Sequence, residues 1–172
     1  MDTAFAGVTV AGRVGVDAFL DSNSVLRVYA FIVGSTGKVY ANFYDGAWEW
    51  RDQGFLNAQG TTPSVGAGVT HFKSSNGNLN VYAAAIGTDN TVYLNYGVLV
   101  PAAWSALPTY AGLTPYTDVG ATAFVVAKDG SQALYVMTVA SVVWSTVERD
   151  LHLDFWKSTN PSQWLALDQG SL

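Results

Sequence analysis

The feature that most constrains this chain is an internal repeat of about 52 residues that occurs three times. Three dipeptides that end in tyrosine, spaced by 53 and 53 residues, mark the copies: Val28-Tyr29, Val81-Tyr82 and Leu134-Tyr135. A glycine precedes each of them, at spacings of 53 and 52 residues: Gly15, Gly68 and Gly120. A second dipeptide follows each tyrosine: Val39-Tyr40, Val92-Tyr93 and Val143-Trp144. A fixed period of this length predicts one structural unit stacked on its own copies.

Each copy is expected to form a β-meander. Turn-forming residues separate short apolar runs, for example at Gly34-Ser35-Thr36-Gly37, Asp45-Gly46 and Gly87-Thr88-Asp89-Asn90. The copies therefore read as three strands and a fourth that bears tryptophan, at Trp48 to Trp50 and near Trp104. In Leu26 to Ile32 both alternating faces are largely apolar, which favours a sheet stacked between two neighbours, as a propeller blade is.

The third copy is the least regular. Residues 131–160 contain neither Gly nor Pro, and four apolar residues recur at every fourth position: Val143, Val147, Leu151 and Phe155. That spacing is compatible with a short helix, whereas the β-branched content of Val139 to Val147 favours strands. We expect one domain over residues 1–172, with repeats at about 8–60, 61–112 and 113–172.

Three blades are too few to close a propeller, which has about four to eight. Two chains would supply six. Charged residues make up only 12% of the chain and hydrophobic residues 49%, so apolar sheet faces need cover from one another or from a second copy. The predicted fold is all-β: three repeated four-stranded β-meanders that form a six-bladed β-propeller by homodimerisation.

Several partners and locations are disfavoured by composition. The net charge is −5 and the eight Lys and Arg residues are scattered, so nucleic acid is not an expected partner. The sequence contains no uncharged apolar stretch of about 18 residues, so no membrane span is predicted. Residues Met1 to Gly7 lack the pattern of a signal peptide, so a cytoplasmic or non-classically secreted protein is expected.

The sequence shows little catalytic chemistry. It has no Cys, and its two histidines, His71 and His152, have no carboxylate at metal-ligand or triad spacing. We therefore predict no metal, no cofactor and no enzymatic activity. One enzymatic alternative is a glycosidase that uses Glu148 with Asp150 or Asp154, because hydrolysis of a glycosidic bond needs two converging carboxylates. The same acidic cluster also fits a charged strand edge.

Aromatic and small polar residues remain in quantity, with six Trp and nine Tyr. An aromatic ring can stack on the C–H face of a sugar while amides and hydroxyls bind its hydroxyl groups. This composition favours a protein that binds glycans or glycoproteins. The tryptophans could equally pack between blades, so a propeller-like interaction or structural module is the alternative.

The first copy resembles a repeat of the Aleuria-type fucose-binding lectins, which are six-bladed β-propellers. The likeness rests on Leu26-Arg27-Val28-Tyr29, a glycine turn, Lys38-Val39-Tyr40, Asp45-Gly46 and Trp48, and the second copy is similar. In that family an Arg on the second strand, a Glu on the third and a Trp hold each sugar between blades.

The resemblance implies candidates for two of these three roles. Arg27 matches the arginine, with Asn80 and Ala133 at the equivalent places, and Trp48 and Trp104 match the tryptophan. The glutamate position falls at Ala41 or Asn42 and at Leu94 or Asn95, so that carboxylate is missing. The implied function is a non-catalytic lectin with shallow sites between blades. Its candidate ligand-binding residues are Arg27, Asn42, Trp48, Asn80, Asn95 and Trp104.

Overall fold

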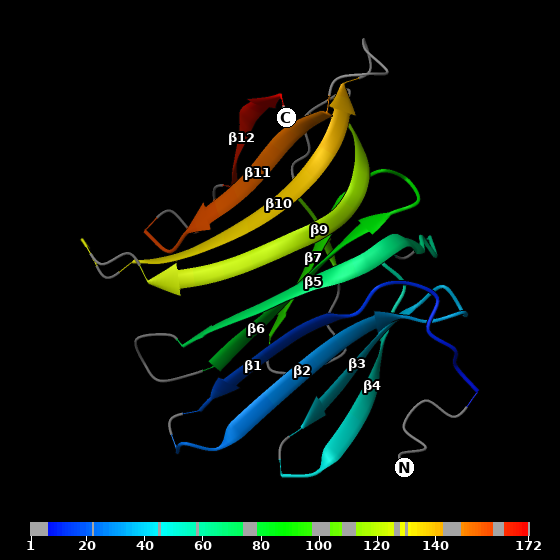
Figure 1. The fold of residues 1–172 in the computed structure, drawn as a ribbon, viewed down its shortest axis with the longest axis vertical. Coiled ribbons are helices and arrows are strands. Elements are labelled where there is room, and N and C mark those ends of the chain that lie inside the picture. The colour runs from blue at the N-terminus through cyan, green and yellow to red at the C-terminus, as the bar shows by residue number, and fades with distance from the viewer. Residues whose placement is uncertain are drawn as a thin grey trace.

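The computed structural model describes residues 7–21, 23–44, 46–57, 59–73, 79–97, 104–107, 113–125, 128–129, 131–142, 149–159 and 164–171. Within these ranges the regular structure consists of strands, and no helix occurs. The strands form three antiparallel sheets of four strands, each in the order of a meander. Figure 1 shows the sheets following one another along the molecule.

Each sheet lies within one of the three repeat ranges. Sheet 1 contains β1 (Gly15–Leu20), β2 (Leu26–Val33), β3 (Val39–Tyr44) and β4 (Trp48–Gly54). Sheet 2 contains β5 (Pro63–Lys73), β6 (Leu79–Gly87), β7 (Val92–Gly97) and β8 (Ser105–Ala106). Sheet 3 contains β9 (Leu113–Val125), β10 (Gln132–Val142), β11 (Arg149–Lys157) and β12 (Trp164–Ser171). The prediction of an all-β fold made of four-stranded meanders is confirmed.

Local turn chemistry explains why the strands fold back on themselves. The Asp21 carboxylate accepts the backbone N–H groups of Asn23 and Val25 at 2.8 and 3.0 Å, which closes the β1–β2 turn. The turn between β2 and β3 has Gly37 at a φ of 78°, a conformation in which a side chain would be strained. Strand order therefore follows from short-range interactions within each repeat.

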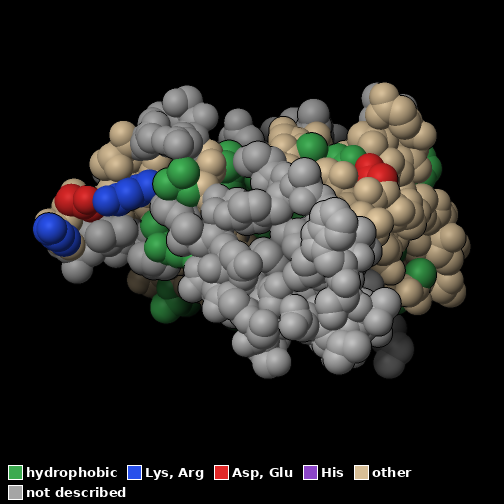
Figure 2. All heavy atoms as spheres, turned by 90° about the horizontal axis from the view of Figure 1, so that it is seen from above, with side chains coloured by type: hydrophobic (Ala, Val, Ile, Leu, Met, Phe, Trp, Pro, Cys, Tyr) green, Lys and Arg blue, Asp and Glu red, His purple; other side chains and the backbone are tan. Residues whose placement is uncertain are grey.

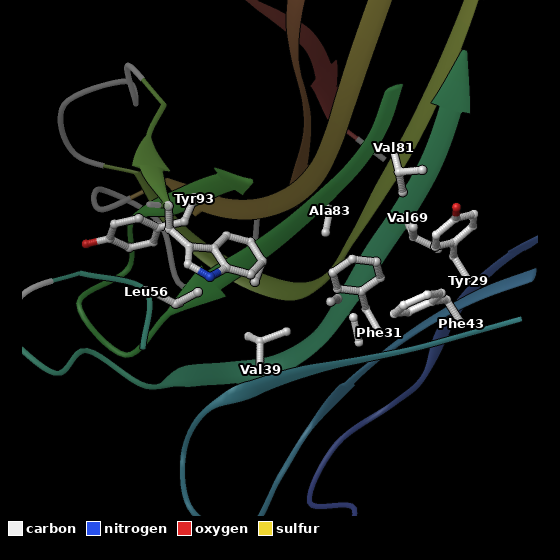
Figure 3. Packing of buried hydrophobic residues seen from close by; sticks show 13 residues of the cluster. Tyr29, Phe31, Val39, Phe43, Leu56, Val69, Val81, Ala83 and Tyr93 are labelled. Atoms are coloured by element: carbon white, nitrogen blue, oxygen red, sulfur yellow. The ribbon is translucent and has the colours of Figure 1, made fainter. Parts of the chain in front are cut away.

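The core consists of two hydrophobic clusters, one in each junction between neighbouring sheets. The first junction, between sheets 1 and 2, buries Tyr29, Phe31 and Phe43 against Val69 and Val81, as Figure 3 shows. The second junction, between sheets 2 and 3, buries Phe72 and Ile86 of sheet 2 together with Leu134 and Val136 of sheet 3. Sheet 2 is thus apolar on both faces because it has a neighbour on each.

The repeated glycine lets the first strands of the sheets approach closely. A Cβ atom on Gly15 of β1 would collide with the carbonyl oxygen of Ala67 in β5. One on Gly68 of β5 would lie 2.6 Å from the carbonyl oxygen of Val119 in β9. Neither position leaves room for a side chain, so β1, β5 and β9 can lie side by side (Figure 1).

The third repeat departs from the sequence alignment. Residues 149–157, which include two members of the four-residue apolar pattern, form strand β11 and not a helix, while 143–148 lie outside the described residues. Tyr135 pairs with Phe155, as Tyr29 pairs with Phe43, so His152 is the counterpart of Tyr40. The alignment of Val143-Trp144 with Val39-Tyr40 is therefore wrong, because the hairpin between β10 and β11 is longer than its counterparts.

Candidate functional site

The first junction is filled by a buried tryptophan. Trp104, just before β8 of sheet 2, is 8% exposed and belongs to the cluster that includes Val39 of sheet 1 and Leu56, which follows β4. Its indole Nε1–H donates to the backbone carbonyl of Gln53 in β4 at 3.1 Å. The indole therefore anchors sheet 2 to the outer strand of sheet 1.

A buried amide pair lies beside this tryptophan. The Asn95 side chain of β7 donates to the Gln53 side-chain oxygen at 3.4 Å. Both residues are buried, and Gln53 lies at a β-bulge where the β3–β4 register shifts between Val39 and Tyr40. The bulge presents Gln53 to the neighbouring sheet, because an extra residue in a strand redirects the side chains around it.

The second junction lacks the tryptophan that fills the first. In the β11–β12 register Ala166 pairs with Asp154, and these positions correspond to Trp104 and Asn95 of sheet 2. An alanine thus occupies the strand position from which Trp104 reaches across the first junction. A cavity of about 360 Å³, partly open to solvent, lies between sheets 2 and 3.

The described residues that line the cavity are aromatic, aliphatic or small and polar, and none of them is charged. Sheet 2 contributes Tyr82, Leu94 and the segment Ser105 to Leu107, and sheet 3 contributes Leu134, Trp156 and Trp164. Trp156 pairs with Trp164 across β11 and β12, and both side chains are half-buried. The lining therefore combines apolar ring faces with hydroxyl groups and indole N–H groups, the combination that suits a small neutral molecule with hydroxyls.

Arg27 lies outside this lining, in an ion pair of its own hairpin. Its Nε and Nη2 atoms donate to Asp21 Oδ2 at 2.9 and 2.8 Å. The pKa of Asp21 is lowered, first by the backbone N–H of Val25 and then by the Arg27 guanidinium. Arg27 thus supports the β1–β2 turn. Asn80, its counterpart in β6, pairs with Phe72 and is half-buried, also outside the lining.

The other predicted residues divide between two places. Asn95 and Trp104 lie together in the first junction, where both are buried and hydrogen-bonded to Gln53. Asn42 and Trp48 lie on the opposite face of sheet 1, where the Trp48 ring contacts Tyr44 at 5.4 Å between centroids. The structure therefore does not bring the six predicted residues into one site.

Trp156 and Trp164 were missed by the sequence reasoning. Register makes them the counterparts of Tyr44 and Trp48, which form the same kind of cross-strand aromatic pair in sheet 1. A correct alignment of the third repeat would have shown this pairing. The error at Val143-Trp144 hid it.

The remaining chemistry of the described residues is sparse. His71 Nδ1 lies 2.5 Å from Asp17 Oδ2, and its ring stacks on Phe19 across the first junction. No group of three potential metal ligands occurs among the residues that the structure describes. The glycosidase alternative rests on residues that the structure does not describe: Glu148 and the side chains of Asp150 and Asp154.

Charge is also scarce on the described surface. Figure 2, which views the molecule of Figure 1 from above, shows few charged side chains. At one edge of this view, Lys or Arg side chains lie beside acidic ones. Two partly exposed lysines are paired in this way, Lys157 with Asp129 at 2.6 Å and Lys38 with Asp52 at 2.7 Å. In the described part of the chain, no helix is long and apolar enough to cross a membrane.

Comparison with known proteins gives a structural match that bears on the fold. No protein-family model and no curated protein sequence matches the chain. Among solved structures, the fucose lectin from Kordia zhangzhouensis in complex with methyl-fucoside is similar, with a TM-score of 0.61 and 19% sequence identity. The match covers 89% of this chain and 97% of the lectin chain. At this level of identity the match supports the fold.

Proposed function

We propose that this protein is a non-catalytic lectin that binds a neutral sugar in the cavity between sheets 2 and 3. The observation that carries the proposal is the pair of half-buried tryptophans, Trp156 and Trp164, in the lining of a 360 Å³ cavity. The structural match to a protein that binds methyl-fucoside supports it.

The chemistry of the lining suits a neutral monosaccharide. An indole face attracts the C–H groups of a sugar ring and excludes water from them. The Tyr82 and Ser105 hydroxyls and the indole N–H groups supply hydrogen-bonding atoms for sugar hydroxyls. None of the described lining residues is charged, so we expect neutral sugars to bind better than a sialic acid or a sulfated glycan. We take a methyl-fucoside as the first ligand to test.

Binding can be tested by calorimetry with methyl-fucoside and by a glycan array. Trp164→Ala is expected to weaken binding at least about tenfold, equivalent to about 1.4 kcal/mol, because it removes one ring of the lining. Ala166→Trp should abolish binding altogether, because an indole at this register position would fill the cavity as Trp104 fills the first junction.

Phe55→Ala is the matched control. It removes an exposed aromatic ring that lies outside the cavity lining and should leave affinity unchanged. If the wild-type protein binds no neutral glycan on the array, the proposal fails. If binding occurs but both cavity variants bind normally, the ligand uses another site, such as one built on Arg27 and Asn80.

We also propose that two copies assemble into a ring of six sheets, which would complete a six-bladed propeller. The support is the apolar outer face of sheet 1, where Val16 and Leu20 are 58% and 66% exposed. Large exposed apolar patches are uncommon on monomeric proteins and mark interaction surfaces.

A further inference from the structure

We infer that sheet 1 of one copy docks on sheet 3 of a second copy through the same contacts that join sheet 2 to sheet 1 within the chain. This inference gives the proposed dimer a residue-level interface and rests on that assembly, but it does not depend on sugar binding. Three observations on separate strands carry it, and each compares an internal junction with an outer face.

The first observation concerns the repeated glycine. Gly15 and Gly68 have no room for a Cβ atom, because the carbonyl oxygens of Ala67 and Val119 in the next sheet occupy the space. Gly120 holds the same register position in sheet 3, where it pairs with Met137 as Gly15 pairs with Phe31. Among the described residues, a Cβ atom on Gly120 would meet only the Met137 methyl group, at 4.0 Å. Sheet 3 thus keeps the glycine of a tight junction without the neighbouring strand.

The residue that should fill this space can be named from the register. Ala67 and Val119 immediately precede the junction glycines of sheets 2 and 3, and Val14 immediately precedes Gly15. Val14 is 48% exposed, at the entrance to β1. We therefore place the Val14 carbonyl of a second copy against Gly120.

The second observation concerns an asparagine and a tryptophan on neighbouring strands. Asn95 and Trp104 of sheet 2 are buried against Gln53 of sheet 1. Their register counterparts in sheet 1 are Asn42 and Trp50, which pair with each other across β3 and β4. Trp50 is 47% exposed, against 8% for Trp104. The Asn42 side-chain oxygen is buried and accepts no hydrogen bond from the described residues.

The third observation concerns Gln53, which accepts the hydrogen bonds from Asn95 and Trp104, and the segment around it, which occurs twice in the sequence. Gln53 lies in the sequence Asp52-Gln53-Gly54, and the same three residues recur as Asp168-Gln169-Gly170. Both segments lie in the fourth strand of their sheet, and both coincide with a register shift that adds one residue to that strand. Sheet 2 has Ala106 and Leu107 at the corresponding positions. The motif is therefore present in sheet 1, which receives Trp104, and in sheet 3, where the described residues include no tryptophan that packs against it.

Together these features make the two outer faces complementary. One copy offers Val14, Asn42 and Trp50 on sheet 1, and the other offers Gly120 and the Gln169 bulge on sheet 3. Each copy carries one face of each kind, so two copies satisfy both contacts and close the assembly. An asymmetric contact that did not close would instead produce fibres.

The experiment adds one methyl group at the predicted contact. The wild-type protein should sediment near twice 18.3 kDa, and Gly120→Ala should sediment near 18.3 kDa. The described residues of the isolated chain leave room for this Cβ, so the far-UV circular dichroism spectrum should not change. Glu49→Ala is the matched control: Glu49 is exposed on β4, adjoins Trp50 and belongs to the opposite strand face, so the variant should remain dimeric.

A cross-linking experiment tests the geometry without weakening the contact at Gly120. The chain has no cysteine, so thiols exist only where they are introduced. A mixture of Asn42→Cys and Gln169→Cys proteins should give a covalent dimer with a short bismaleimide, whereas Glu49→Cys mixed with Gln169→Cys should give little. A monomeric wild-type protein would overturn the dimer itself. A dimer that survives Gly120→Ala and gives no Asn42–Gln169 cross-link would overturn this interface alone.

Discussion

Trp104 provides the sharpest stability prediction, because sequence and structure give it different roles. As a sugar platform it could be removed with little loss of stability, whereas in the structure its indole is buried between sheets 1 and 2. Replacing a buried Trp with Ala costs about 3 to 5 kcal/mol in unfolding free energy. We expect Trp104→Ala to fall in the upper half of that range, because the Gln53 carbonyl also loses its donor, a net loss of about 1 kcal/mol.

Urea unfolding followed by circular dichroism would measure this loss. Gln53→Ala is the control, because it removes the side-chain acceptor of the Asn95 hydrogen bond but keeps the backbone carbonyl that accepts from Trp104, so it should cost only about 1 kcal/mol. Both variants should be compared at one protein concentration, since dimerisation adds to apparent stability. A loss below about 1 kcal/mol for Trp104→Ala would refute the anchoring role. Lost glycan binding with unchanged stability would support the role of Trp104 as a sugar platform.

Two further predictions concern other parts of the molecule. Gly68→Ala should reduce the unfolding free energy by about 1 to 3 kcal/mol, measured in the same urea assay, because its Cβ would lie 2.6 Å from the Val119 carbonyl oxygen. Hydrogen bonds from Lys157 and then from Ser131 lower the pKa of Asp129. Any stability gained there is therefore present above the unfolded pKa of 3.8 and lost as the pH falls through the lower folded value, and Lys157→Met should raise the pKa of Asp129 in an NMR titration.

The fold could be predicted from sequence because each repeat encodes its own hairpins. Both faces of β2 are largely apolar, as the sequence indicates, and Tyr29 and Phe31 lie on the face that packs against sheet 2. Turn residues such as Gly37 mark where the strands reverse. Residues 131–160 have no Gly or Pro to punctuate them, so the position of β11 could not be fixed from local signals. The position of β11 is set by its pairing with β10 and β12, which involves residues distant in the sequence.

The site residues were harder to predict because a side chain's availability depends on the neighbouring sheet. Trp48, Trp50 and Trp104 look alike in sequence, as aromatic residues of a fourth strand. Trp104 is covered because sheet 1 lies against it, whereas Trp48 and Trp50 are about half exposed because no sheet within the described chain covers that face. The repeat pattern identifies equivalent positions, but it does not say which of them meets a neighbour.

The cavity between sheets 2 and 3 also depends on which side chains meet across a junction. Equivalent strands bring equivalent positions together at every junction, so the volume between two sheets is set by the side chains at a few register positions. At the first junction that volume holds the Trp104 indole and the Asn95–Gln53 amide pair. At the second junction the register supplies Ala166 in place of the tryptophan and Leu107 in place of the glutamine. The pair of tryptophans in the lining lies two residue pairs farther along β11 and β12. Space for a ligand therefore arises where the repeat loses a packing residue, so the least regular repeat is the one that lines the candidate site.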